Sequence, residues 1–306
     1  MKSARRLLPL LIALSACEQV IEPDLPEHTP RLVVHSLFTS DGGWSAHVGR
    51  STGILQRLPH VDRAVADADV KLLTGERVVG ELRFDEAARV YVLDDGGLRA
   101  GETYSLEVSA PGFETVRATD TVPLPVPTSV RPGSRGGFSI ELELQDPPGE
   151  ANYYQVSLYL VFTGRGATRV EGLLSTRDPS IMADSRGDDS PVEEGSFEGP
   201  APYFRDTLFD GQTHEIELSY SGDWVEGLGT IVREEGELEG EEQDDPEHAG
   251  STAYLQVLYI SETYYEYLKT ARLHGEIREN PFAEPLNVHG NVENGYGIFA
   301  GYSSRT

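Results

Sequence analysis

The sequence predicts a mainly β fold of two β-sandwich domains in tandem, of the Ig-like or transthyretin-like kind, with one short helix in the C-terminal half. Three observations predict it. Apolar and polar residues alternate in many short segments, clusters of Gly, Asp and Pro separate these segments, and a helical pattern occurs in a single stretch. Such alternation is typical of strands with one buried face, and short strands at regular spacing favour sandwiches.

Residues 1–16 are predicted to be a lipoprotein signal peptide. Positive charges near the start precede the apolar run Leu7–Leu14, which is too short to span a bilayer. The run ends in LSAC at residues 14–17, which matches the bacterial lipobox at every position. Cys17 is the sole cysteine, so we expect lipid on its sulfur and no intramolecular disulfide. The alternative is a plain signal peptide with a chance cysteine.

Residues 17–30 are predicted to be the lipidated N-terminus and a tether. The segment after the cysteine, EQVIEPDLPEHTP, carries three prolines and no periodicity. An extended Pro-rich chain spans roughly 3 Å per residue, so the tether would reach about 40 Å. Several acyl chains hold a protein firmly at a membrane. We therefore expect a body that is attached to a membrane by lipid and does not span it.

The first domain is predicted over residues 31–122. Its expected strands are LVVHSLF, ADVKLL, RVYVLDD and ETYSLEVSA. In the last of these, Tyr104, Leu106 and Val108 alternate with polar residues, which predicts one buried face. The stretch GETYSLEVSAPGFETV also resembles the closing strands of small Ig-like or transthyretin-like modules.

Residues 123–133 are interpreted as a Pro-rich linker between the domains, or as a paired edge. Prolines stand at positions 123, 125, 127 and 132. Because proline has no N–H to give to a strand ladder, the segment is excluded from the centre of a sheet.

The second domain is predicted over residues 134–306. FSIELELQD alternates, YYQVSLYLVF is apolar on both faces and predicts a central strand, and HEIELSY and AYLQVLYI predict further strands. SETYYEYLKTARL predicts the helix, with Ser261 as N-cap and Glu262 in the first turn. The tyrosines at 264, 265 and 267 favour packing of this helix on a sheet, with an aromatic ligand platform as the alternative.

Two long acidic loops are predicted, at residues 176–202 and 233–250. The second holds nine carboxylates and one arginine. Blocks of like charge usually stay solvated, although long loops also carry binding functions. Calcium is the alternative, but the spacing of Asp184, Asp188 and Asp189 does not follow an EF-hand loop. We therefore predict no metal site.

The overall charge excludes one class of partner. The chain has 51 Asp and Glu against 25 Lys and Arg, whereas nucleic-acid binding needs clustered cations. We interpret the acidity as a property of a solvated surface, with cation binding as the alternative reading.

No motif of known catalytic chemistry occurs in the sequence. Gly-x-Ser-x-Gly, Ser-x-x-Lys, His-Glu-x-x-His, a P-loop and a dinucleotide fingerprint are missing, and the eight histidines are scattered. The sequence therefore predicts a protein that is not an enzyme, with no catalytic residues and no cofactor. Carboxylate pairs for glycoside hydrolysis stay open, because a sequence does not give their separation.

The C-terminal stretch is predicted to be a turn followed by a final strand. Gly295 and Gly297 permit backbone conformations closed to other residues, and Asn291 and Asn294 favour turns. We expect GIFAGY to pass into the core of the second domain.

Several segments, in order over nearly the whole chain, resemble one family. They are RLVVHSLF (31–38), ADV (68–70), GETYSLEVSAPGF (101–113), DPPGEANYY (146–154), FRDTLFDG (204–211) and ENPFAEPLNVHGNVENGYGIFAGYSS (279–304). With the lipobox before them, they resemble the Bacteroidota-type outer-membrane lipoproteins classed as a domain of unknown function, DUF4249.

The resemblance implies an accessory part in uptake, because members are often encoded beside a TonB-dependent receptor. It implies no catalytic or ligand residue, and only the anchor at Cys17 is carried over. Surface-exported lipoproteins of that lineage tend to cluster acids after the cysteine. Here Glu18, Glu22 and Asp24 are spread out, so both faces of the membrane stay open.

We therefore expect a non-enzymatic envelope lipoprotein that works with a TonB-dependent receptor β-barrel in nutrient uptake. One alternative is a surface adhesin or glycan-binding module, for which exposed Trp44 or Trp224 would be the expected sugar platform. Another is a lipid-anchored hydrolase that uses paired carboxylates in a cleft.

Overall fold

The computed structural model describes residues 28–53, 63–94, 97–133, 139–163, 167–185, 196–220, 229–232, 237–241, 251–277, 284 and 286–305. Within these ranges the fold is mainly β, with two sheets, so this part of the prediction is confirmed. In the same part of the chain, no helix has the length and apolar character needed to cross a bilayer.

The larger sheet runs through almost the whole molecule. Its path is β11 (Ala167–Gly172), β10 (Tyr153–Thr163), β18 (Ser251–Ile260), β19 (Tyr296–Arg305), β1 (Leu32–Thr39), β2 (Trp44–Arg50), β5 (Val90–Leu93), β4 (Arg77–Asp85), β3 (Asp69–Thr74), β6 (Thr103–Ser109) and β7 (Val116–Thr121). Off this path, β14 (Tyr203–Arg205) pairs with β10, and β16 (Gly229–Val232) pairs with β17 (Glu237–Glu241), which pairs with β18.

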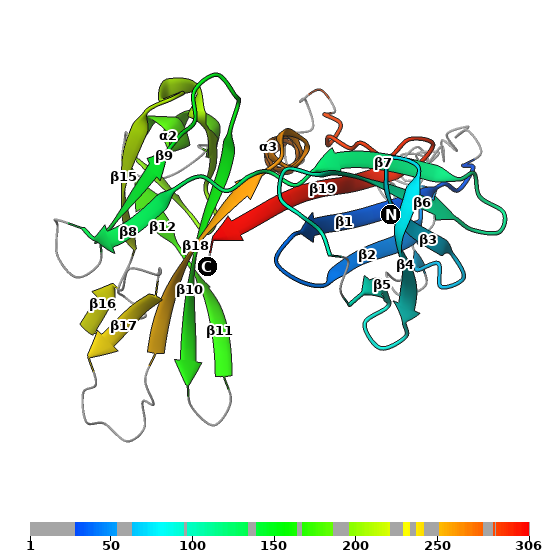
Figure 1. Cartoon of the computed structure of the whole chain (residues 1–306), viewed down its shortest axis with the longest axis horizontal. Coiled ribbons are helices and arrows are strands. Elements are labelled where there is room, and N and C mark those ends of the chain that lie inside the picture. Colours follow the sequence, from blue (N-terminus) through cyan, green and yellow to red (C-terminus); the bar gives the residue numbers. More distant parts are fainter. Residues whose placement is uncertain are drawn as a thin grey trace, which may run out of the picture.

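The smaller sheet has the order β13 (Phe197–Gly199), β12 (Leu174–Thr176), β15 (Thr213–Tyr220), β9 (Ser139–Gln145) and β8 (Thr128–Pro132). The helices in the described residues are α2 (Pro179–Ser185), the 3₁₀ turn η3 (Asp206–Leu208) and α3 (Glu262–Ile277). Figure 1 shows two bodies, which we call the N-lobe (β1–β7) and the C-lobe (β8–β18), with β19 running between them and α3 above their junction.

The N-lobe is one sheet that curls around its own core. Val34, Leu72, Leu106 and Val116 are buried together with residues of every strand in the lobe. Its last strand, β7, returns beside β19 (Figure 1). Just before β19, Glu293 pairs with Arg117 of β7 in an isolated antiparallel β-bridge between their backbones. The predicted alternation holds, since residues 103–109 of β6 bury every second side chain.

The C-lobe is a sandwich of two sheets. Ile140, Leu142 and Leu144 of β9 and Ile216 and Leu218 of β15 face the long strands β10 and β18 across a common core. Packing of two apolar sheet faces about 10 Å apart is the usual way to bury them. β10 is flanked by β11 and β18, which confirms the predicted central position of YYQVSLYLVF.

The last strand belongs to both lobes. Its first part, from Tyr296 to Tyr302, pairs in parallel with β1, and its end, from Tyr302 to Arg305, pairs with β18 of the C-lobe. Phe299 is buried in the N-lobe core, where its ring stacks on Phe38 with centroids 4.2 Å apart. The prediction that GIFAGY enters the core of the second domain is therefore wrong for Phe299.

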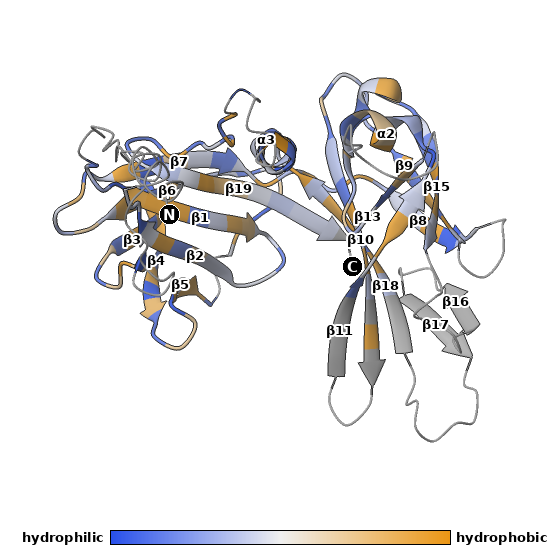
Figure 2. Ribbon diagram, turned by 180° about the vertical axis from the view of Figure 1, so that it is seen from behind, coloured by the Kyte–Doolittle hydropathy of each residue, from blue (hydrophilic) through white to orange (hydrophobic). Residues whose placement is uncertain are grey.

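Because of β19, the tandem-sandwich arrangement is not confirmed. One continuous sheet crosses from residues 31–122 into residues 134–306, and Figure 2 shows the same connection from behind. The proposed linker, residues 123–133, divides into a segment outside any strand and the edge strand β8. The edge interpretation therefore holds for residues 128–132, where proline is tolerated.

The predicted helix is α3, and it packs as expected. The Oγ of Ser261 accepts a hydrogen bond from the Tyr264 N–H at 3.2 Å, which confirms the N-cap. Tyr264 and Tyr265 are buried against Ile260 and Ile298, so these two rings are core residues and not an exposed platform.

Candidate functional site

The predicted anchor lies outside the described residues. Residues 1–27 are not described, so the signal peptide, Cys17 and most of the tether over 17–30 stay predictions. The described chain begins at the N-lobe, where the Ser51 hydroxyl contacts the His28 ring at 3.1 Å and accepts the Arg31 N–H at 3.0 Å. The tether is therefore expected to leave from this lobe.

The two predicted acidic loops are only partly described. Residues 186–195, 233–236 and 242–250 lie outside the described residues, and so do Asp188 and Asp189. The rest of 176–202 is not an open loop, since it contains α2 and β13. Asp178 caps α2 by accepting the Ser180 N–H at 2.9 Å. The Asp-Pro pair at 178–179 was a usable signal for this helix start, because proline suits the first helical position.

Asp184, considered above as a calcium ligand, has a structural role. It is buried at the end of α2 and accepts the Arg205 N–H at 3.0 Å. Its second oxygen lies 3.6 Å from Nε of the same arginine. These bonds connect α2 to β14.

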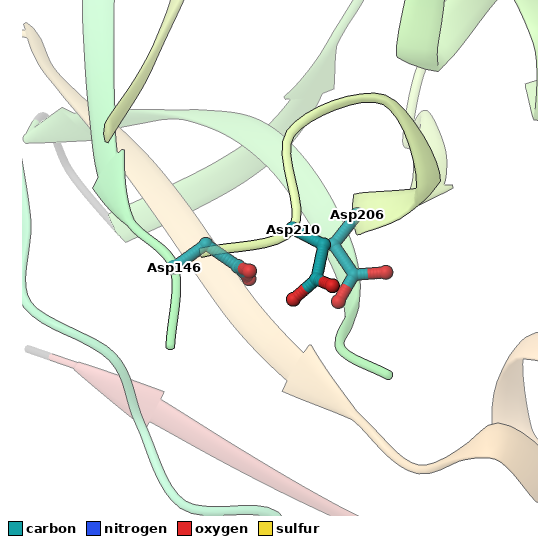
Figure 3. A group of neighbouring side chains, drawn as sticks. All are labelled: Asp146, Asp206 and Asp210. Carbon is teal, nitrogen blue, oxygen red and sulfur yellow. The ribbon is translucent and has the colours of Figure 1, made fainter. Parts of the chain in front are cut away.

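Three carboxylates that we did not predict as a group meet at one end of the C-lobe. Asp146, Asp206 and Asp210 place ligand oxygens within 4.8 Å of one another (Figure 3). They come from DPPGEANYY and FRDTLFDG, two segments of the family resemblance described above. A sequence shows the two segments but not their contact, because 50 or more residues separate them.

Each carboxylate in this cluster holds the opposite segment. Oδ2 of Asp146 accepts the Gly211 N–H at 3.0 Å, and Asp206 accepts the Asn152 N–H at 2.7 Å. Asp210 accepts the Gly149 N–H at 2.7 Å. The two turns are therefore clamped reciprocally through backbone donors that would otherwise need water.

The surroundings of the cluster shift the pKa of Asp206 upward. Burial raises the pKa of Asp206, and the charges of Asp146 and Asp210 raise it further, whereas the hydrogen bond from the Asn152 N–H lowers it. The Tyr154 hydroxyl donates a hydrogen bond to Asp146. The pKa of Tyr154 is raised mainly by burial and next by its bond to this carboxylate. Carboxylate oxygens suit hard cations such as Ca²⁺. All three already accept hydrogen bonds from the chain, and we interpret them as a clamp.

A cleft lies beside this clamp, where the two lobes meet. It has a volume of about 650 Å³ and is lined by parts of residues 120–127, 145–154 and 259–262, with Gly101. Asn152 and Tyr154 belong to both places, since they line the cleft and bond to the clamp carboxylates. The clamp therefore shapes one wall of the cleft.

Hydrogen bonds across the lobe junction fix the other walls. Asp120 accepts the Gly301 N–H at 2.8 Å and the Ser261 hydroxyl at 2.5 Å, so it connects β7, β19 and α3. The buried Tyr259 hydroxyl donates to the Val126 carbonyl at 3.1 Å and also contacts the Thr128 hydroxyl. The Pro-rich segment is thereby held against β18.

The other predicted sites are not assembled by the described residues. Trp44 is 2% exposed, and its Nε1 donates to the Ser36 hydroxyl at 2.6 Å, so it does not offer a sugar platform. Trp224 lies outside the described residues.

The fold and the cleft define the class of this chain as a mainly β protein with two lobes that share one strand. It belongs to the family described as Domain of unknown function (DUF4249), whose model matches residues 18–306. The expected family is therefore confirmed. A search of curated proteins finds no match to the chain.

Proposed function

We propose that this chain is a lipid-anchored, non-enzymatic protein of the outer membrane that assists a TonB-dependent receptor in nutrient uptake. The observation that carries the proposal is the sole cysteine at the last position of a lipobox, one residue before the family match begins at residue 18. The family resemblance supports the receptor as partner.

Support for a non-enzymatic role comes from the chemistry of the described acids. Asp146, Asp206 and Asp210, whose carboxylates lie together, accept hydrogen bonds from backbone donors and Tyr154. Their partners are structural, and they stand outside the described lining of the cleft. Glycoside hydrolysis would need two carboxylates that flank a substrate in a cleft. Glu150 and Glu262, which do line the cleft, are therefore the acids on which the hydrolase alternative depends.

The anchor is tested by mass spectrometry of the protein purified from its native envelope. We expect a first residue at Cys17 that carries a diacylglyceryl thioether, and incorporation of labelled palmitate. Cys17→Ser should abolish labelling and release the protein from membranes, whereas Ser15→Ala, which keeps a small residue before the cysteine, should not. An unmodified thiol at Cys17 would contradict the proposal.

The partner is tested by crosslinking in intact cells, followed by purification of the lipidated chain in mild detergent. We expect a β-barrel receptor among the crosslinked proteins, and its loss with Cys17→Ser. Recovery of the chain without any β-barrel, at crosslinking yields that capture a known membrane complex, would contradict this part of the proposal.

A further inference from the structure

The inter-lobe cleft has the size and construction of a ligand site. Its volume of about 650 Å³ lies within the range of roughly 300–1,000 Å³ that is usual for small-molecule pockets. The walls are fixed by the half-buried Asp120 and the buried Tyr154 and Tyr259, whose polar atoms are hydrogen-bonded within the protein. A ligand would therefore meet a preformed surface, which lowers the ordering cost of binding.

One wall of the cleft is apolar and open to solvent. It is formed by the segment from Val122 to Pro127, in which Leu124 is 64% exposed. The prolines at 123, 125 and 127 contribute rings and carbonyl acceptors but no backbone N–H donors. The half-buried Tyr153 also lines the cleft and adds an aromatic ring. This wall suits the apolar body of a ligand.

The charge of the cleft is of one sign. Among the described residues that line it are the carboxylates Asp120, Glu150 and Glu262, and none of these lining residues is Lys, Arg or His. Asp120 accepts hydrogen bonds from within the protein, whereas Glu150 and Glu262 are exposed. Burial, and then the negative charge of Glu262, raise the pKa of Tyr153 to about 12. The tyrosine is therefore neutral near pH 7 and lies close enough to Glu262 to feel its charge.

These features select among possible ligands. An anion would meet charges of its own sign in the lining, from Glu150 and Glu262. A metal ion would need several oxygens converging on one point, and in the described residues such a group occurs at Asp146, Asp206 and Asp210, outside the lining of the cleft. An organic cation satisfies both walls, because its charge meets the carboxylates and its body meets the prolines and the aromatic ring.

We propose that the inter-lobe cleft binds an organic cation, with an ammonium or guanidinium group at Glu150 and Glu262 and an apolar body against the Pro-rich segment and Tyr153. The cation belongs to a small amine or to a basic side chain of a short peptide, and both share this chemistry. The site does not depend on the lipid anchor or on a receptor partner.

Ligand-observed NMR on the full mature protein in a non-ionic detergent tests the proposal, with empty micelles subtracted. The first probes are phenethylamine, its neutral counterpart 2-phenylethanol and its anionic counterpart phenylacetate. Acetyl-Leu-Arg-Tyr-amide and acetyl-Leu-Glu-Tyr-amide form the peptide pair. We expect saturable binding of the cationic member in at least one set. Tighter binding of the arginine peptide assigns the cation to peptides, and tighter binding of phenethylamine assigns it to small amines.

The decisive variant is Glu150→Gln combined with Glu262→Gln. Both residues are exposed, so the fold should persist, and glutamine keeps the shape of the side chain and removes its charge. We expect cation binding to weaken about fivefold or more, with binding of 2-phenylethanol unchanged. Glu198→Gln, an exposed acid on β13, should bind as the parent does. Equal binding of cation and anion, no binding of any cation, or unchanged affinity in the double variant would overturn the proposal.

Discussion

Gly297 of β19 lies opposite Val34 of β1 in a parallel ladder, so close that a Cβ atom on Gly297 would come within 3.0 Å of the Val34 carbonyl oxygen. The glycine also has a φ of +111°. Both facts require glycine at the point where the last strand enters the N-lobe sheet. The glycine pattern of the closing segment therefore serves the strand that joins the lobes.

Gly297→Ala should destabilise the protein strongly. The Cβ meets backbone, which does not move aside as a side chain would, and φ is unfavourable for alanine. We expect a loss of about 3 kcal/mol or more in the free energy of unfolding, measured by urea denaturation followed by circular dichroism. Gly275→Ala is the control, because a Cβ there meets nothing within 4 Å on helix α3. It should be neutral or stabilising by about 0.5–1 kcal/mol.

The sequence predicts local features of this fold well. Alternation predicts the strands, Ser261 marks the start of α3, and the prolines at 127 and 132 mark an edge. These signals report on one strand, one cap or one face. They do not say which strand lies beside which, because pairing depends on the whole sheet. The parallel pairing of residues 296–302 with residues 33–39 was therefore not predictable, and the assignment of Phe299 to the wrong core followed from that.

The candidate site was predicted less well for the same reason. The turn at 146–152 and the segment at 204–211 were both recognised in the sequence, yet their carboxylates meet through tertiary contacts. The acid-rich stretches of the sequence lie at 176–202 and 233–250, whereas Glu150 and Glu262 stand alone and share a cleft only because α3 begins at the lobe junction. Charge density along a chain does not report on convergence in space.

Tyr154→Phe tests the bond between the C-lobe core and the clamp. The Tyr154 hydroxyl is buried and donates to Asp146, so its removal leaves a buried carboxylate with one donor fewer. We expect a loss of about 1–3 kcal/mol in the free energy of unfolding. Tyr296→Phe, at a side chain 49% exposed, should stay within about 0.5 kcal/mol of the parent. Equal unfolding midpoints for the two variants would show that the buried hydroxyl is not stabilising.

Ser261→Ala removes a cap and a contact between the lobes. The hydroxyl accepts the Tyr264 N–H at the start of α3 and donates to Asp120. We expect a loss of about 1–2 kcal/mol in thermal or urea unfolding experiments. Ser45→Ala is the matched control, because the Ser45 side chain is exposed on β2. Its backbone carbonyl, which accepts the Ser36 hydroxyl, is kept in the variant. If both variants unfold at the same urea concentration, Ser261 does not stabilise the junction.

The carboxylate clamp makes stability depend on pH in a defined direction. Burial, together with the charges of Asp146 and Asp210, raises the pKa of Asp206 above its unfolded value of about 3.9. The folded state therefore binds the Asp206 proton more tightly than the unfolded state does. The stability that this proton contributes is fully present below the unfolded pKa and is lost as pH rises through the folded pKa.

Asp206→Asn should remove this dependence, because the amide carries no charge and its oxygen can still accept the Asn152 N–H. The variant should therefore gain stability relative to the parent as pH rises: its free energy of unfolding, minus that of the parent, should become more positive between about pH 4 and pH 7. Asp206→Ala lacks the acceptor and should lose about 1–3 kcal/mol relative to Asp206→Asn at every pH in this range. Urea denaturation at a series of pH values measures both effects. A difference between Asp206→Asn and the parent that stays constant with pH, or that falls as pH rises, would show that the three carboxylates do not repel one another in the folded protein.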